Sequence, residues 1–325
     1  MAPLLEVDRL SVSFDTEAGL LNVVDDLSFE LSAGESLGLV GESGCGKSVS
    51  ALAIMGLLAK PSGRVDGGDI RLAGESLLGL DEIGRASIRG RRIAMIYQEP
   101  MTALNPVQRI GQQLAEARQL HEPDLSSDAV RRASLELLDR VGIPAPESRL
   151  DEYPHELSGG MRQRVVIAMA LACKPEILIA DEPTTALDVT IQAQILQLLR
   201  DLQSEYGMAM IFITHDLGVI AELTNRVIVM YAGRLAESAD VVPLFGEPRH
   251  PYTRGLLTAI PRLEDEPKTL LPTIQGMVPT LADMPPGCRF SNRCEYANDA
   301  CTVVPPLEVS ERHAVACHHW REIGA

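Results

Sequence analysis

The chain has 325 residues, with 29 Lys and Arg against 45 Asp and Glu, so its formal net charge is −16. Hydrophobic residues make up 46% and charged residues 23%, which indicates a folded rather than a disordered protein. The negative charge disfavours nonspecific nucleic-acid binding, which depends on clustered Lys and Arg. It leaves room for a nucleotide, because backbone N–H groups and one lysine can bind phosphate.

The length suggests two domains, or one large α/β domain with an appendage, at about 150 residues per domain. No apolar run approaches the roughly 20 residues that a membrane-spanning helix needs. The N-terminal sequence MAPLLEVDRL lacks a basic region followed by an apolar core, so we expect no signal peptide and a cytoplasmic chain. Cysteines in that compartment are more often free, metal-bound or catalytic than paired in disulfides.

Strand and helix patterns alternate along the first 240 residues. Short apolar runs predict strands within 4–14 and 24–40, and at 92–97, 177–181, 209–214 and 226–231. Helical periodicity predicts helices at 47–59, across 106–172, and at 190–206. Ser127 and Gly142 fit the start and the stop of one of them. This alternation predicts an α/β fold with a parallel or mixed sheet, interrupted by a helical insert at about 99–165.

The composition changes after about residue 240, where prolines become frequent and four of the six cysteines fall in the last 40 residues. We therefore predict two domains, 1–240 and 241–325. The second is expected to be a small, Cys-rich appended domain rather than a continuation of the sheet.

A phosphate-binding loop is the strongest motif. The sequence GESGCGKS directly follows the apolar strand SLGLV and precedes a helix, as the phosphate-loop (P-loop) pattern requires. Its glycines let backbone N–H groups converge on phosphates, the lysine reaches the β and γ phosphates, and the serine hydroxyl ligates Mg²⁺. The predicted ATP-binding residues here are Gly41, Glu42, Ser43, Gly44, Cys45, Gly46, Lys47, Ser48 and Val49.

Two carboxylates end the apolar strand ILIAD. Asp181 can hold the Mg²⁺ water shell, and Glu182 can polarise the water that attacks ATP. An acidic turn after a strand is common, so this pattern gains its weight from the phosphate loop beside it.

A third motif, LSGG followed by MRQR at residues 157–164, opens a helix at Ser158, Gly159 and Gly160. Serine is a good N-cap, and the glycines leave the helix N-terminus open to an anion. LSGG about 20 residues before the ILIAD strand, in a chain with a phosphate loop, resembles the signature of the ABC ATPases. The resemblance covers residues 4 to about 240.

This resemblance implies roles for matching residues. Gln98 looks like the Q-loop glutamine that contacts Mg²⁺, so the implied metal ligands are Ser48, Gln98 and Asp181. Residues 185–188, ending at Asp188, resemble the D-loop at the dimer interface. His215 looks like the switch histidine that contacts the γ phosphate. Phe14 is the aromatic expected to stack on adenine, although a Phe at the end of a strand is more often a core residue.

The same resemblance implies a mechanism. Two such domains pack head to tail, and each ATP lies between the phosphate loop of one and the LSGG of the other. The chain has one copy of each motif, so it must pair with itself or with a relative. ATP closes the dimer and hydrolysis at Glu182 releases it, which makes closure the mechanical stroke.

Finer features favour a transporter subunit over a soluble ABC protein of DNA repair or translation. The sequences QEPMTALNP (98–106), RHPYTRGLL (249–257), GMVP (276–279) and PPGCRF (285–290) resemble the ATPase subunits of dipeptide/oligopeptide permeases. That family implies two membrane-spanning permease subunits, a second ATPase subunit (usually as a heterodimer), an extracytoplasmic binding protein and a place on the cytoplasmic face of the cell membrane. Importers of nickel, antimicrobial peptides and glutathione share the pattern.

The four late cysteines are Cys288, Cys294, Cys301 and Cys317. Four thiolates suit either tetrahedral Zn²⁺ or a [4Fe–4S] cluster, and His313, His318 and His319 are close enough in sequence to be alternative ligands. Four unligated cysteines remain possible, but an appendage this short needs a staple to fold. The family resemblance favours iron–sulfur over zinc.

Overall fold

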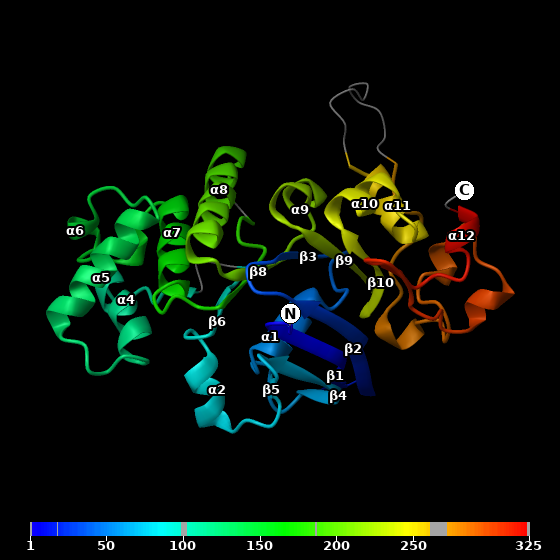
Figure 1. Cartoon of the computed structure of the whole chain (residues 1–325), viewed down its shortest axis with the longest axis horizontal. Coiled ribbons are helices and arrows are strands. Elements are labelled where there is room, and N and C mark those ends of the chain that lie inside the picture. The colour runs from blue at the N-terminus through cyan, green and yellow to red at the C-terminus, as the bar shows by residue number, and fades with distance from the viewer. Residues whose placement is uncertain (1, 18, 99–102, 186, 261–271, 324–325) are drawn as a thin grey trace. The chain divides into compact units, whose positions relative to one another are not determined.

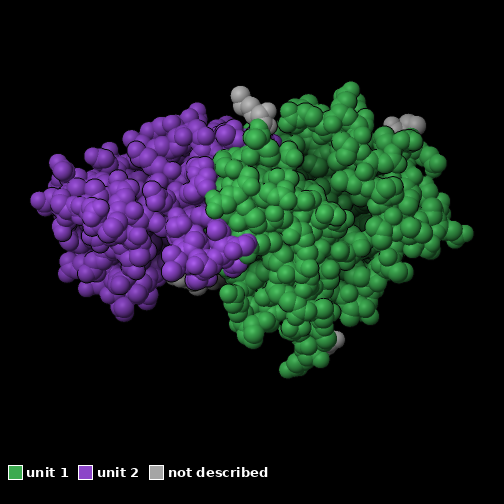
Figure 2. Space-filling model, turned by 60° about the horizontal axis from the view of Figure 1, so that its bottom comes forward, with its two compact units in different colours: residues 1–31, 36–78, 213–325 green, residues 32–35, 79–212 purple. Residues whose placement is uncertain are grey.

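The computed structural model describes residues 2–17, 19–98, 103–185, 187–260 and 272–323. It divides the chain into two compact units (Figure 2). Unit 1 comprises Met1–Leu31, Ser36–Leu78 and Ile213–Ala325, and unit 2 comprises Ser32–Glu35 and Gly79–Phe212. The predicted boundaries at 240 and at 99–165 describe a different division and stay predictions.

An antiparallel sheet opens unit 1, in the order β2-β1-β4-β5 (Figure 1). Alternate residues of β1, such as Leu5 and Val7, are buried, as expected of a strand with one face on a core. Leu5 lies opposite Leu31 of β2 and Leu72 of β4. The bounds are β1 Leu5–Thr16, β2 Gly19–Leu31, β4 Gly63–Leu72 and β5 Glu75–Ser76.

The strand before the phosphate loop belongs to a second set of unit 1 strands, in the order β11-β12-β10-β9-β3. All five residues of β3 are buried, which a strand covered on both faces requires. It runs parallel to β9, whereas β9, β10, β12 and β11 pair antiparallel. The sheet is therefore mixed. The bounds are β3 Ser36–Val40, β9 Arg226–Tyr231, β10 Arg234–Asp240, β11 Glu308–Ser310 and β12 His313–Val315.

After residue 240 the chain adds strands β12 and β11 to this sheet, so the expectation that this segment does not continue the sheet was wrong. The domain boundary itself stays a prediction. Strand β12 pairs with β10, where Glu237 lies opposite Val315. An uncovered β10 would leave a row of unpaired N–H and C=O groups at the sheet edge. Glu237 is fully buried on β10; its carboxylate lies 2.6 Å from His313 Nε2 and accepts hydrogen bonds from the backbone N–H groups of Arg249 and His250.

The described part of unit 1 also contains short helices. They are α1 Lys47–Ile54, α9 Leu217–Leu223, α10 Val241–Gly246, α11 Pro251–Thr258 and α12 Trp320–Ile323, with the 3-10 helices η2 Leu281–Asp283, η3 Ser291–Arg293 and η4 Asp299–Thr302.

Unit 2 combines three neighbouring strands, in the order β8-β7-β6, with a group of helices (Figure 1). Strands β6 and β7 are parallel and fully buried. Helices α4, α5 and α7 pack against one another, in line with the predicted helical stretch. The bounds are α2 Glu82–Ile88, β6 Ile93–Ile96, α4 Ile110–Gln119, α5 Ser127–Arg140, α6 Pro146–Arg149, η1 Pro154–Glu156, α7 Gly159–Ala170, β7 Ile177–Asp181, α8 Val189–Tyr206 and β8 Ala209–Ile213.

Two predicted helix ends need correction. The helix expected at 47–59 stops at Ile54, because Gly56 adopts a positive φ of 63° and turns the chain. The N-cap of α5 is Ser126, whose hydroxyl accepts from Ala129 N–H, and not Ser127. The helix predicted at 190–206 is α8, and Gly207 ends it in the left-handed conformation.

Within the part of the chain that is described, no helix is both long and apolar enough to cross a membrane.

Candidate functional site: an ATP-binding cassette

The predicted phosphate loop connects β3 to α1 in unit 1. Gly41 has a φ of 148°, and a Cβ there would lie 2.2 Å from the carbonyl oxygen of Met230. Gly46 is the N-cap of α1 with a φ of 100°. These two positions accept only glycine, since an L side chain would collide with backbone or strain it.

The lysine of the loop is almost fully buried, with 6% of its surface exposed. Lys47 Nζ donates to the carbonyl oxygens of Gly41 (2.7 Å) and Glu42 (3.1 Å), so the ammonium is held over the loop. Cys45 is buried beneath it, and burial raises the pKa of its thiol. Ser48 and Val49 follow in the first turn of α1, and the positive end of the helix dipole lies here.

A side chain far along the sequence fixes the start of this loop. The hydroxyl of Tyr252, on α11, accepts a hydrogen bond from the backbone N–H of Glu42 at 2.8 Å. Tyr252 is fully buried, and burial raises its pKa above the ordinary value. The segment RHPYTRGLL stands out in the sequence, but no local pattern indicates this hydrogen bond, because the two residues are 210 positions apart.

In unit 2 the structure brings the predicted Q-loop glutamine to the predicted catalytic glutamate. Glu182 Oε2 accepts from Gln98 Nε2 at 3.1 Å and from Thr185 Oγ1 at 2.8 Å. Glu182 itself has a φ of 46°, a left-handed conformation that costs energy in a non-glycine residue and is typical of functional sites. Asp181, the last residue of β7, is buried. Residues 99–102 of the Q-loop region lie outside the described residues.

The signature motif begins helix α7, as predicted. Ser158 is exposed and caps the helix by accepting a hydrogen bond from Met161 N–H at 3.3 Å. Gly160 packs so closely on α8 that a Cβ would lie 2.9 Å from Ile191 Cγ2. Asp188 caps α8 by accepting from Ile191 N–H. Ile191 thus contacts both Gly160 of the signature motif and Asp188 at the end of the D-loop. Residue 186 of the D-loop lies outside the described residues.

Two predicted residues remain, His215 and Phe14. His215 is exposed, after the end of β8. Phe14 is half-buried on β1, and its ring lies against Gly63 of β4.

The four late cysteines lie in one region of unit 1. Cys288 N–H donates to the Cys301 carbonyl at 2.9 Å. Burial raises the pKa of Cys288 and Cys294, and raises that of Cys317 to about 11, with the charges of the neighbouring cysteines adding to the effect. Nevertheless, the residues that the structure describes contain no group of three or more His, Cys, Asp or Glu side chains that could hold a metal ion. As they are arranged, the described thiols do not form a metal site.

Comparisons with known proteins identify the family of this chain. The family model "ABC transporter" matches residues 24–185, and the model "Oligopeptide/dipeptide transporter, C-terminal region" matches residues 236–301. A dimeric ATP-binding cassette in a post-hydrolysis state, bound to ADP and Pi, is similar with a TM-score of 0.65 and 26% identity. The match covers 73% of this chain and 98% of that one.

Relatives similar over their whole length carry transport names. A peptide import ATP-binding protein of Brucella abortus is 52% identical over 335 aligned residues, covering 99% of both chains. A peptide ABC transporter ATP-binding protein of Sinorhizobium fredii is 51% identical over 98% of this chain and 95% of its own. The chain therefore belongs to the ABC transporter family. It is an ABC ATPase, and its residues 236–301 are similar to the C-terminal region of oligopeptide and dipeptide transporters.

Proposed function

We propose that this chain is the ATP-hydrolysing subunit of an importer of dipeptides or oligopeptides. One observation carries the proposal: an ABC cassette is followed by a segment similar to the C-terminal region of oligopeptide/dipeptide transporters. Full-length relatives named for peptide import support it. The peptide is not expected to touch this chain, which supplies the driving force.

The proposed roles follow the geometry within each unit. Residues 41–49 cradle the phosphates, with Lys47 aimed at the β and γ phosphates and Phe14 against adenine. Glu182 polarises the attacking water, and its hydrogen bonds with Gln98 and Thr185 support this role because they fix the carboxylate. His215 contacts the γ phosphate.

Mg²⁺ is the metal expected with ATP. Its proposed ligands are Ser48, Gln98 and Asp181, whose hydroxyl, amide and carboxylate oxygens are the donors that Mg²⁺ prefers. When bound, the metal neutralises charge on the phosphate oxygens.

Two cassettes are proposed to act together, with Ser158, Gly159, Gly160 and Asp188 of one completing the ATP site of the other. Exposure of Ser158 at the start of α7 supports this, because an anion can reach the helix N-terminus there. The partners would be a second, homologous ATPase subunit, two membrane subunits and an extracytoplasmic binding protein. The complex would place this chain on the cytoplasmic face of the cell membrane.

The test uses the complex purified with its membrane subunits and placed in liposomes. We expect the ATPase rate to rise when the cognate binding protein and a pool of di- and oligopeptides are added together. A complex carrying Glu182→Gln gives the background rate. A response to nickel or glutathione instead of peptides would replace the substrate, and failure to purify any membrane subunit would contradict a transport role.

We also propose a domain boundary near 240, a helical insert at about 99–165, and a [4Fe–4S] cluster on Cys288, Cys294, Cys301 and Cys317. The gathering of the four thiols in one region supports the cluster. The side-chain geometry opposes it, because the described residues form no group of three or more ligands that could hold a metal ion. Iron and zinc should be counted in anaerobically purified protein, with Cys301→Ser compared to Cys173→Ser. The cluster is supported if the protein contains about four irons per chain and Cys301→Ser, but not Cys173→Ser, loses them. Stoichiometric zinc, or no metal, contradicts it.

A further inference from the structure

The phosphate loop carries a negative charge of its own. Glu42 is the second residue of GESGCGKS, in a loop expected to receive the polyanion ATP. A carboxylate a few Å from phosphates repels them, and the repulsion grows where water is partly excluded. The loop therefore needs a cation that binds Glu42.

Arg293 is that cation. Its Nη1 donates to Glu42 Oε2 at 2.6 Å and its Nη2 donates to Glu42 Oε1 at 3.1 Å. Two parallel bonds of this kind fix the direction of a carboxylate as well as its charge. Arg293 ends η3 in the C-terminal segment, 251 residues after Glu42.

Arg293 is itself held on every side. Only 3% of its side chain is exposed. Its Nε donates to the carbonyl oxygen of Gln275 at 3.0 Å, and its guanidinium lies 5.8 and 5.9 Å from the ring centres of Tyr231 and Phe290. The hydrogen bond with Glu42 raises the pKa of Arg293. A guanidinium that is buried and hydrogen-bonded in this way has a fixed position, unlike a charge on the surface.

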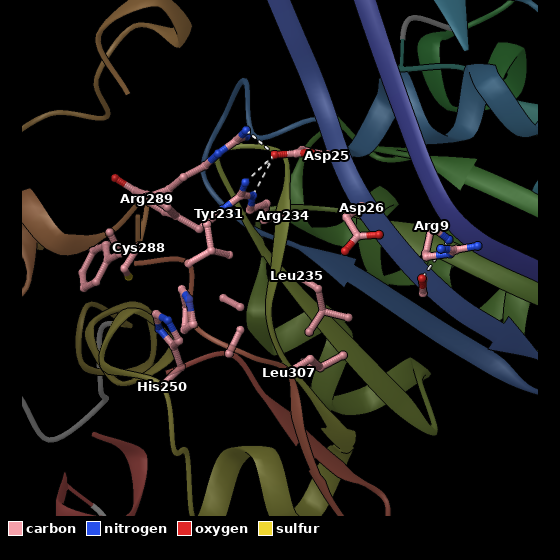
Figure 3. A pocket seen from close by; sticks show the side chains of 16 residues that line it. Arg9, Asp25, Asp26, Tyr231, Arg234, Leu235, His250, Cys288, Arg289 and Leu307 are labelled. Carbon is pink, nitrogen blue, oxygen red and sulfur yellow. Dashed lines mark hydrogen bonds and ion pairs between the residues drawn. The ribbon is translucent and has the colours of Figure 1, made fainter. Parts of the chain in front are cut away.

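A second arginine of the same segment reaches the loop indirectly. Arg289 and Arg234 both bind Asp25 Oδ2 at 2.7 Å, beside a cavity of about 470 Å³ (Figure 3). Arg289 also donates to the carbonyl of Ala232. The next residue, Gly233, donates its N–H to the carbonyl of Cys45 in the phosphate loop at 2.9 Å. Residues 289–293 thus contact both the loop and the turn that supports it.

We propose that Arg293 is a positioning residue for ATP. It neutralises Glu42 and fixes its carboxylate, so that the C-terminal segment keeps the phosphate loop able to accept a triphosphate. The inference rests on the proposed role of residues 41–48 in phosphate binding.

The experiment measures the Kd of Mg-ATP and of Mg-ADP for the full-length chain, with the thermal midpoint Tm recorded for each variant. Arg293→Met keeps the apolar volume of the side chain beside Tyr231 and Phe290. We expect it to raise the ATP Kd about 10- to 100-fold, and the ADP Kd less, because it removes hydrogen bonds to a charged group and frees a carboxylate beside the phosphates. Arg293→Lys, which keeps the charge, should give an intermediate Kd.

The double variant Glu42→Gln/Arg293→Met separates positioning from plain stability. It lacks both charges, so it should bind ATP at least about tenfold more tightly than Arg293→Met although both have a similar Tm. A matched control is Arg312→Ala, an exposed arginine of the same segment that pairs with Asp240; its Kd should equal that of the wild type.

The proposal fails if Arg293→Met and Arg293→Lys bind ATP as Arg312→Ala does. It also fails if the double variant binds no better than Arg293→Met, so that affinity follows Tm alone. If Lys47→Ala leaves the ATP Kd unchanged, the assigned phosphate loop is at fault instead, which distinguishes the two failures.

Discussion

The phosphate loop and the signature motif are both glycine-containing helix starts, yet they are held in opposite ways. The loop before α1 is buried at its two ends, at Gly41, Cys45 and Gly46, and is fixed by distant residues. Met230 and Tyr252 contact its backbone, and Arg293 binds the Glu42 side chain. The start of α7 is exposed: its cap is local, with Met161 N–H donating to Ser158 Oγ, and Gly160 packs on Ile191 of α8. One anion site is preorganised within the chain, whereas the other is presented outward.

This difference matches the proposed division of labour. A site that must bind ATP in the single chain needs a loop whose conformation is fixed before the ligand arrives. A motif that completes a site on a second cassette needs an accessible surface. Variants should therefore separate into those that impair nucleotide binding by one chain and those that impair only the paired, hydrolysing state.

The largest effect is expected from Lys47→Ala. Removing the ammonium should lower ATP hydrolysis at least about 100-fold, because it deletes the main protein charge on the β and γ phosphates. Phosphate release by the reconstituted complex measures this, with nucleotide binding by the isolated chain as a second readout. The exposed Lys60→Ala is the control; a Lys47→Ala variant with normal hydrolysis would contradict the assignment of the loop.

Glu182→Gln should slow hydrolysis by about 100-fold or more while ATP still binds, since an amide cannot accept the proton of the attacking water. The variant should accumulate as a closed, ATP-bound dimer, which size-exclusion chromatography with ATP against ADP detects. Glu176→Gln, at an exposed carboxylate paired with Arg92 just before β7, is the matched control. Normal turnover by Glu182→Gln would remove Glu182 from its role.

Lowering the pH should destabilise the segment around Tyr252, which fixes the phosphate loop, and should leave the signature helix unchanged. Burial lowers the pKa of His250 to about 4 from 6.5. Below pH 6.5 the unfolded chain binds a proton at His250 and the folded chain does not, so acid favours unfolding. The stability present above pH 6.5 therefore falls by up to about 3 kcal/mol as the pH drops toward 4. Hydrogen exchange at pH 7 and pH 5, corrected for intrinsic rates, should show faster opening at 250–254 but not at 159–165. His250→Asn, whose oxygen can replace Nδ1 as the acceptor for Tyr252 N–H, should reduce the pH difference; equal opening of both regions would contradict this prediction.

The smallest effect is expected from Ser158→Ala. Loss of the cap costs about 1 kcal/mol of local helix stability, and loss of the hydroxyl should lower hydrolysis by the complex about tenfold. The ATP Kd of the isolated chain should not change, because the motif serves the opposite cassette. Ser126→Ala, which removes the cap of α5, controls for the cap alone. A higher ATP Kd for the isolated Ser158→Ala chain would contradict the proposed difference between the two regions.

Local features were predictable from the sequence because they depend on neighbouring residues. The caps at Ser158 and the stop at Gly207 follow from hydrogen bonds within a few positions, and both were found. Helix α1 ended earlier than its apolar pattern suggested, since a single backbone conformation at Gly56 outweighs the pattern. Gln98 and Glu182, which are both predicted to act on ATP, share a hydrogen bond, and their roles stay predictions.

By itself, the sequence determined the ABC ATPase class, the phosphate loop, the strand that ends at Asp181 and the signature helix, because contiguous motifs encode each of them. Only the tertiary structure decided that β12 extends the sheet beside β10, and that Tyr252 and Arg293 hold the phosphate loop. These contacts join residues more than 70 positions apart. Their partners are chosen by burial and charge complementarity in the folded core, which no local pattern records.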